Sequence, residues 1–213
     1  MVQVKKTETR QAILDAAFKL FSDVGYLSAT IAQIARKAEV STSNFYSYFD
    51  SKLEVFYELY EPWLKDRLLR LEEQLHAMTD SKEMLESLLR ALWCDIPREN
   101  GGFAVNLIQA IATGDPSTGY RPGLLRWIEQ RVASILTDCL PPEKRNYLAQ
   151  TSTAHVLMMA FDGFVIGRHL HPRTRFDDGV VTQFAAILLA DSAPSGTEFQ
   201  SESRSPKQNH VRY

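Results

Sequence analysis

A chain of 213 residues with 45% hydrophobic and 23% charged residues has the composition of a globular protein of one or two domains. There is no long apolar run and the N-terminus is polar, so we expect neither a membrane span nor a signal peptide. Cys94 and Cys139 are isolated thiols without metal-ligand spacing, as expected in a reducing cytosol. We therefore expect a cytoplasmic protein without a membrane partner.

The formal net charge of −2 is unevenly distributed. Residues 1–52 contain seven lysines and arginines against five acidic residues, whereas the remainder contains 17 against 21. The N-terminal quarter therefore carries +2 and the rest −4, which is the sign expected of a nucleic-acid-binding head, although the excess is modest.

The first predicted helix covers residues 8–24 and buries Ile13, Leu14 and Phe21 on one face. Gly25 is the residue expected to end it. Residues 1–7 are predicted to form a mobile, mildly basic arm ahead of it.

Residues 28–52 carry three helix-start signals in close succession. Thr30 with Gln33 has the pattern of a capping box, Ser41 caps a second helix, and Asp50 or Ser51 caps a third. The connection 38–40 has the length of the turn in a helix-turn-helix.

The short helix after Ser41 has an uncharged outer face. Phe45 and Phe49 can face a core, and the side chains left outside are Thr42, Ser43, Asn44, Tyr46, Ser47 and Tyr48. Hydroxyls, an amide and phenols suit base edges and phosphate oxygens in a major groove, and Lys52 adds a positive charge beside them. Spacing alone leaves open a three-helix packing unit whose polar face meets only water.

The remaining chain is predicted to form a helical bundle. A long helix runs from Ser51 to about Met78 with a bend at Pro62, and further helices follow at 80–95, 103–113, 124–140, 143–170 and 177–191. Loops are predicted at 97–102 and in GDPSTGYRPG at 114–123. No stretch alternates as a strand should, so we expect an all-α fold of about nine helices. Its parts are a domain at 1–52, a bundle at 53–191 and a disordered tail at 192–213.

No phosphate loop, nucleophile elbow or dinucleotide fingerprint is present, so we expect no catalysis and no cofactor. His155, His169 and His171 lack matching cysteine or carboxylate spacing, so we predict no metal site. Large apolar side chains with isolated polar groups suit a small-molecule pocket between helices, and equally an ordinary helical core. The candidate ligand-binding residues are Trp63, Trp93, Phe103, Asn106, Trp127, His155, Met159 and Asp162.

Roughly the first 55 residues resemble the DNA-binding domain of the TetR family of transcriptional regulators. The match is long and in register, and its residues are Thr9-Arg10, Ile13-Leu14, Ala16-Ala17, Leu20-Phe21, Gly25-Tyr26, Thr30, Ile34-Ala35, Ala38, Val40-Ser41, Phe45-Tyr46, Tyr48-Phe49 and Ser51-Lys52. The chain departs from the family at Glu39, where a glycine is common. A side chain there costs roughly 1 kcal/mol if the turn needs a positive φ.

The resemblance implies a homeodomain-like helix-turn-helix head and a C-terminal bundle that binds a small molecule and dimerises through its last two helices, about 143–170 and 177–191. A two-fold dimer suits a palindromic double-stranded DNA operator. The expected function is a ligand-responsive regulator, a repressor that a small molecule releases from DNA, with DNA contacts from Thr30, Ser41 to Asn44, Tyr46 to Tyr48 and Lys52. The alternative is a helical sensor or adaptor that keeps the head without binding specific DNA.

Overall fold

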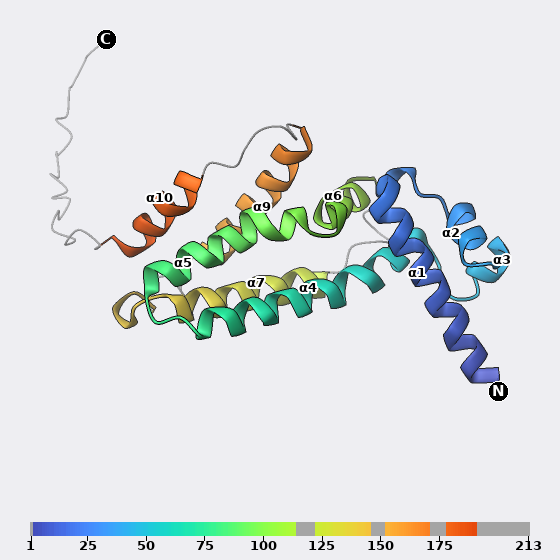
Figure 1. Ribbon diagram of the computed structural model, residues 1–213, viewed down its shortest axis with the longest axis horizontal. Helices are drawn as coiled ribbons and strands as arrows, with labels where there is room; N and C mark the ends of the chain where they lie inside the picture. The colour runs from blue at the N-terminus through green and yellow to red at the C-terminus, as the bar shows by residue number, and fades with distance from the viewer. Residues whose placement is uncertain (1, 114–121, 146–151, 171–177, 191–213) are drawn as a thin grey trace, which may run out of the picture.

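The computed structural model describes residues 2–113, 122–145, 152–170 and 178–190. Every element in these ranges is helical, which confirms the all-α prediction. Helices α1 (Val2–Ser28), α2 (Ile31–Lys37) and α3 (Thr42–Phe45) form a small head at one end of the molecule (Figure 1). The long helix α4 (Lys52–His76) leaves the head and runs along the bundle beside α7 (Pro122–Cys139).

The start of the chain differs from the prediction of a mobile arm. Helix α1 begins at Val2, so the arm at residues 1–7 is wrong for the described part of it. The segment contains no proline or glycine to stop a helix, and its lysines and glutamine are good helix formers. The predicted role of Gly25 is confirmed, because its φ of 79° and ψ of 165° interrupt the helical backbone there.

All three predicted helix starts are capped, and of the two candidates Asp50 and Ser51 it is Ser51 that caps α4. The hydroxyls of Thr30, Ser41 and Ser51 accept hydrogen bonds from the backbone N–H groups three residues on, at 3.2, 3.1 and 3.0 Å. Gln33 completes the capping box, since its side chain accepts from the backbone N–H of Thr30 at 2.8 Å. Each cap satisfies a donor that the helix itself leaves unpaired, so these residues fix where α2, α3 and α4 begin.

The apolar core of the head is continuous with that of the bundle, and Phe45 is the one buried residue that α3 contributes to it. Phe45 and Phe49 are buried and belong to the same apolar cluster as Ile13, Phe21, Ile34 and Phe56 from α1, α2 and α4. Arg10 on α1 lies 4.8 Å above the Phe49 ring and forms a 2.9 Å ion pair with Glu58 on α4. A four-residue helix is too short to be stable alone, so this packing holds α3 in place.

The bundle is completed by α5 (Ser81–Arg90), α6 (Phe103–Thr113), α9 (Thr153–Leu170) and α10 (Asp178–Leu189). The loop predicted at 97–102 is wrong: α5 continues as a π-helical segment, Ala91–Asp95, and a 3-10 helix, Ile96–Gly101. Pro97 lies in the first turn of that 3-10 helix. A backbone N–H there would have no acceptor within the helix, so its absence in proline costs no hydrogen bond. Gly102, with a φ of 83°, ends the segment.

Several predicted features fall outside the described residues. These are residues 114–121 of the predicted turn, residues 146–151 of the predicted 143–170 helix, and the whole of the tail at 192–213. On either side of 146–151, residues 142–145 and 153–170 are helical. Cys94 and Cys139 are both free and buried. None of the described helices combines the length and the apolarity of a membrane span.

Candidate nucleic-acid interface and ligand cavity

The outer face of α3 is exposed as the sequence predicts. Thr42, Ser43, Asn44 and Ser47 are exposed, and Tyr46 keeps 52% of its surface open to solvent, whereas Tyr48 is half-buried. Ser41 works locally: besides capping Asn44, its hydroxyl lies 2.9 Å from the hydroxyl of Ser43. The structure thus gathers hydroxyl, amide and phenol groups on α3 and the turn that follows it, at the end of the head.

The ammonium group of Lys52 is bonded within the protein and does not extend freely into solvent. Its ammonium donates hydrogen bonds to the backbone carbonyls of Tyr26 and Ala29, at 2.8 and 2.9 Å, and lies 4.1 Å above the Tyr26 ring. Partial burial lowers the pKa of this ammonium from its usual value. An ammonium has three donors, and two of them here tie the start of α4 to the connection between α1 and α2.

Glu39 has a φ of 58° in the turn between α2 and α3, so the turn does need a positive φ. The positive φ on which the predicted strain depends is therefore confirmed. The turn is nevertheless well bonded, because the N–H groups of Glu39 and Val40 donate to the carbonyls of Arg36 and Ala35 at 3.2 and 2.9 Å.

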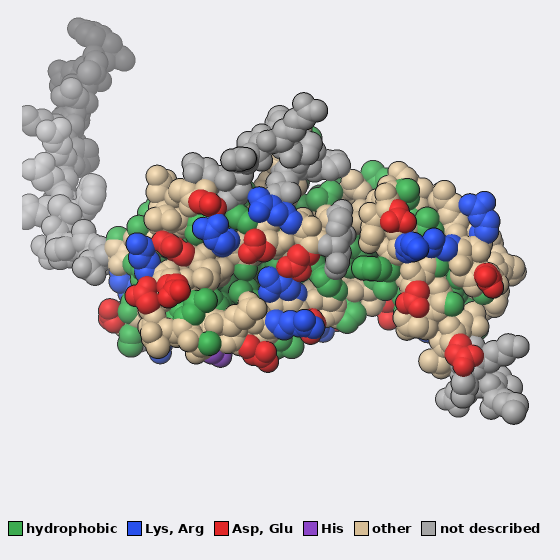
Figure 2. Space-filling view, viewed as in Figure 1, with side chains coloured by type: hydrophobic (Ala, Val, Ile, Leu, Met, Phe, Trp, Pro, Cys, Tyr) green, Lys and Arg blue, Asp and Glu red, His purple; other side chains and the backbone are tan. Residues whose placement is uncertain are grey.

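Charge on the molecule is mixed rather than segregated. Basic and acidic side chains are interspersed on the face shown in Figure 2, over the bundle as well as the head. Near the helix-turn-helix, Arg36 and Lys37 are exposed at the end of α2. Cations at that end also interact favourably with the helix dipole.

A cavity of about 220 Å³ lies within the bundle between α4, α6, α7, α9 and the segment 91–101. Most of its lining is apolar, and its polar groups come from Tyr60, Glu129, His155 and Asp162. The remaining lining residues are Leu64, Leu68, Leu92, Ile96, Leu107, Leu125, Ile128, Met158, Met159 and Phe161.

The structure brings three of the eight predicted ligand residues to this cavity: His155, Met159 and Asp162. His155 and Asp162, seven positions apart on α9, share a face as the helical spacing predicts. Tyr60 and Glu129 are lining residues that the sequence analysis missed. Tyr60 lay in the apolar stripe of α4, and Glu129 beside the buried Ile128 of α7, so neither differed from an ordinary helical position.

The other five predicted ligand residues lie elsewhere in the structure. Phe103 is buried under Trp63 and Phe56, with ring centroids 5.3 and 5.0 Å away. Trp93 is buried against Phe164 and Phe184, and its indole N–H donates to the carbonyl of Leu157 at 3.2 Å. These rings hold helices together.

Trp127 is half-buried on α7 beside the ammonium of Lys65, which lies 5.1 Å from its ring.

Asn106 joins the bundle to the head. It is 4% exposed on α6, accepts a hydrogen bond from the N–H of Tyr26 at 2.9 Å and donates one to the carbonyl of Phe21 at 3.2 Å. Both partners lie at the end of α1, on either side of Gly25. The amide side chain therefore satisfies backbone groups that the interrupted helix leaves unpaired.

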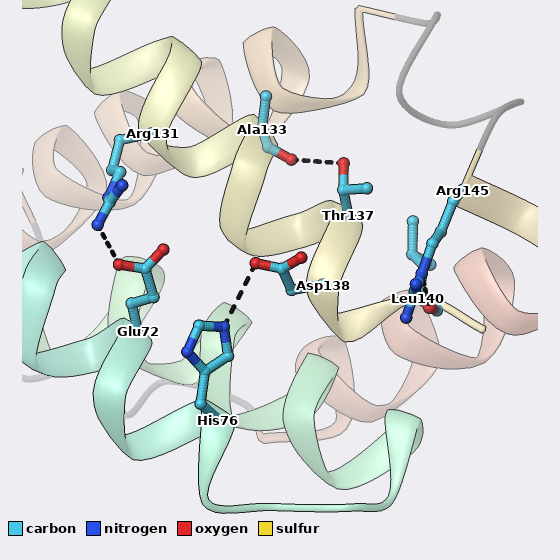
Figure 3. Close-up of polar contacts among 8 residues, drawn as sticks. All are labelled: Glu72, His76, Arg131, Ala133, Thr137, Asp138, Leu140 and Arg145. Carbon is cyan, nitrogen blue, oxygen red and sulfur yellow. Dashed lines mark hydrogen bonds and ion pairs between the residues drawn. The ribbon is translucent and has the colours of Figure 1, made fainter. Parts of the chain in front are cut away.

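A second polar cluster fastens α4 to α7 (Figure 3). Arg131 pairs with Glu72, and His76 lies 3.4 Å from Asp138. Glu72, His76 and Asp138 bring one possible metal-ligand atom each within 4.8 Å of one another. Because a guanidinium already neutralises Glu72 and the other two side chains are exposed, we interpret the cluster as ion pairs between helices.

The N-terminal part of the chain matches a family model described as bacterial regulatory proteins, tetR family, over residues 13–59. The regulator HbdR of Aromatoleum sp. (strain CIB) is 37% identical over 86 residues, which are 40% of this chain and 36% of HbdR. The regulator SrpR of Pseudomonas putida is 52% identical over 48 residues, 22% of each chain. The matches to these relatives thus cover less than half of their own length.

Solved structures resemble the chain over most of its length. The multidrug binding protein EbrR, complexed with imidazole, has a TM-score of 0.61 at 18% identity and covers 86% of this chain and 91% of its own. Thermus thermophilus FadR, a repressor in complex with lauroyl-CoA, has a TM-score of 0.57 at 20% identity, covering 88% of this chain and 99% of its own. At such identities the likeness concerns the fold. The family model and the sequence relatives show that the N-terminal head, residues 13–59, is similar to the head of the tetR family of bacterial regulatory proteins.

Proposed function

We propose that the protein is a dimeric, ligand-responsive transcriptional regulator, a repressor that binds a palindromic DNA operator. The observation that carries the proposal is the exposed, uncharged face of α3, held at the tip of a helix-turn-helix head by caps and aromatic packing. Residues 1–52 would act as the DNA-binding domain and residues 53–191 as the ligand-binding and dimerisation domain. Catalysis has no part in this proposal.

Thr42, Ser43 and Asn44 are the residues proposed to contact base edges. They occupy the first turn of α3, and the N-terminal residues of a recognition helix are those that reach the bases in a major groove. Thr30, Tyr46, Ser47, Tyr48 and Lys52 are proposed to contact phosphates, with Ser41 holding the start of the helix.

The dimer is proposed to form through α9 and α10. Both helices expose large apolar side chains, including Ile166 at 45%, Leu170 at 65% and Ile187 at 66%. Gly163 and Gly167 face open space, since a Cβ added at either would meet no atom of the described chain within 4 Å. A stripe of glycines flanked by exposed apolar side chains suits close approach by a second copy.

Ligand control would run from the cavity to the head through α4 and α6. Both helices line the cavity, through Tyr60, Leu64 and Leu107, and both contact α1. A ligand can cause the dimer to release DNA only if it binds more tightly to a dimer arrangement in which the spacing of the two heads does not match the operator.

The testing experiment is selection of genomic DNA fragments by the purified protein, followed by a salt titration of the best fragment. We expect a palindromic site and a steep loss of affinity with salt. Asn44→Ala should weaken binding to that site by about 1–3 kcal/mol, whereas Gln74→Ala, an exposed amide on α4, should leave it unchanged. Weak binding without sequence preference would contradict the proposal and favour a sensor or adaptor that does not bind specific DNA.

A further inference from the structure

Two polar groups at the cavity have no hydrogen-bond or ion-pair partner among the described residues. They are the hydroxyl of Tyr60, a residue only 1% exposed, and the carboxylate of Asp162. Buried polar groups are normally paired, and an unpaired hydroxyl on a cavity wall is available to a bound molecule.

The charge in the cavity is negative. Glu129 and Asp162 supply two carboxylates, His155 lies 3.2 Å from Glu129, and no lysine or arginine is among the described lining residues. Asp162 is exposed on α9, and the protein around it desolvates its carboxyl only in part, which raises the pKa of that carboxyl. A positive charge beside Asp162 would relieve that unfavourable desolvation.

The walls between these groups are aliphatic and aromatic, and the space is small. A volume of about 220 Å³ lies below the roughly 300–1,000 Å³ of typical ligand pockets. It suits a compact apolar body. An acyl-CoA, the type of ligand held by the Thermus thermophilus structure, would bring phosphates towards a lining that offers them no lysine or arginine among the described residues.

We propose that this cavity binds a small lipophilic organic cation, with Asp162 as the charge partner of its ammonium group and the Tyr60 hydroxyl as a hydrogen-bond acceptor. The inference rests on the proposed function only in treating this cavity as the effector site. Apolar walls would bury the hydrocarbon part, and the histidine contact of Glu129 leaves Asp162 as the unpaired carboxylate.

The test uses three probes with one hydrocarbon body and different charges: phenylbutylamine, phenylbutanol and phenylbutyrate. Binding of each to the full-length protein is measured by titration calorimetry at neutral pH, without DNA. We expect the amine to bind most tightly and the carboxylate most weakly. Asp162→Asn should weaken amine binding by about tenfold or more and leave the affinity for the alcohol unchanged.

Matched variants keep the test specific. Glu73→Gln removes an exposed carboxylate on α4 away from the cavity and should not change amine affinity. Tyr60→Phe removes only the hydroxyl and should weaken amine binding, with a thermal unfolding scan to verify folding. Equal or tighter binding of the carboxylate, no binding of the amine, or an unchanged amine affinity in Asp162→Asn would overturn the inference.

Failure of this inference is distinguishable from failure of the regulator proposal. Specific operator binding without amine binding removes the ligand class and leaves the regulator. Amine binding without specific DNA binding contradicts the regulator and supports the cavity assignment.

Discussion

Glu39 adopts a backbone conformation that is unfavourable for a residue with a Cβ atom. Its φ of 58° lies in the left-handed region, which costs a residue with a Cβ about 1–2 kcal/mol. A glycine would avoid that strain but would lose more entropy on folding, so the net gain is smaller than the strain itself.

We therefore expect Glu39→Gly to stabilise the protein by up to about 1 kcal/mol. Urea unfolding followed by circular dichroism measures this. Glu39→Ala is the control, because it removes the same carboxylate and keeps the strained backbone. Equal stabilisation by both variants would assign the effect to charge instead.

Lys52 combines two possible contributions on one side chain. Its two carbonyl contacts are charge-assisted hydrogen bonds that hold the end of the α1 segment to the start of α4. We also expect its remaining donor to be available for a phosphate contact.

Lys52→Ala should weaken binding to all DNA sequences, lower the salt slope by about one unit, and reduce the melting temperature. Fluorescence anisotropy at several salt concentrations and a thermal scan measure the two effects. A lower melting temperature with an unchanged salt slope would remove Lys52 from the DNA contacts and leave it a role in the fold alone.

At the scale of elements, α6 is the helix that touches both ends of the molecule. Asn106 bonds to the end of α1, and the next residue, Leu107, lines the cavity. A ligand that displaces Leu107 would therefore move a helix that is hydrogen-bonded to the head.

Asn106→Ala should destabilise the protein by about 1–3 kcal/mol, because it leaves a buried N–H and a buried carbonyl without partners. Urea unfolding measures this. Gln109→Ala, a half-buried amide on the same helix, should change stability much less. Equal losses of unfolding free energy in both variants would mean that the hydrogen bonds of Asn106 do not stabilise the protein.

At the scale of the whole molecule, the proposed dimer depends on the apolar surface of α9 and α10. A stable interface buries about 1,200–2,000 Å² in total, and an inserted charge at its centre is left without a partner.

Ile187→Glu should convert the dimer to a monomer in size-exclusion chromatography with light scattering, and should abolish tight operator binding. Leu69→Glu, at a 43% exposed leucine on α4, is the control and should remain dimeric. A dimer that survives Ile187→Glu and is lost in Leu69→Glu would place the interface on α4.

The sequence by itself determined the local features of the head. Thr30 and Ser41 cap the helices they were predicted to cap, and Ser51 is one of the two candidates predicted for the third, because a cap depends on atoms only three residues apart. The uncharged face of α3 was also predictable, since Phe45 and Phe49 leave only one side of a short helix for the core. The apolar stripe of α4 followed from helical periodicity in the same way.

Only the tertiary structure decided which side chains meet. Asn106 looked like a ligand residue among apolar neighbours, yet it bonds to Tyr26, 80 positions earlier. Trp93 and Phe103 were predicted to line a pocket and instead pack against other aromatic rings. Tyr60 and Glu129, which are 69 positions apart in sequence, both line the cavity. Periodicity identifies the face that a helix buries, but the neighbour it is buried against depends on long-range packing, and packing alone leaves the space in which a ligand can bind.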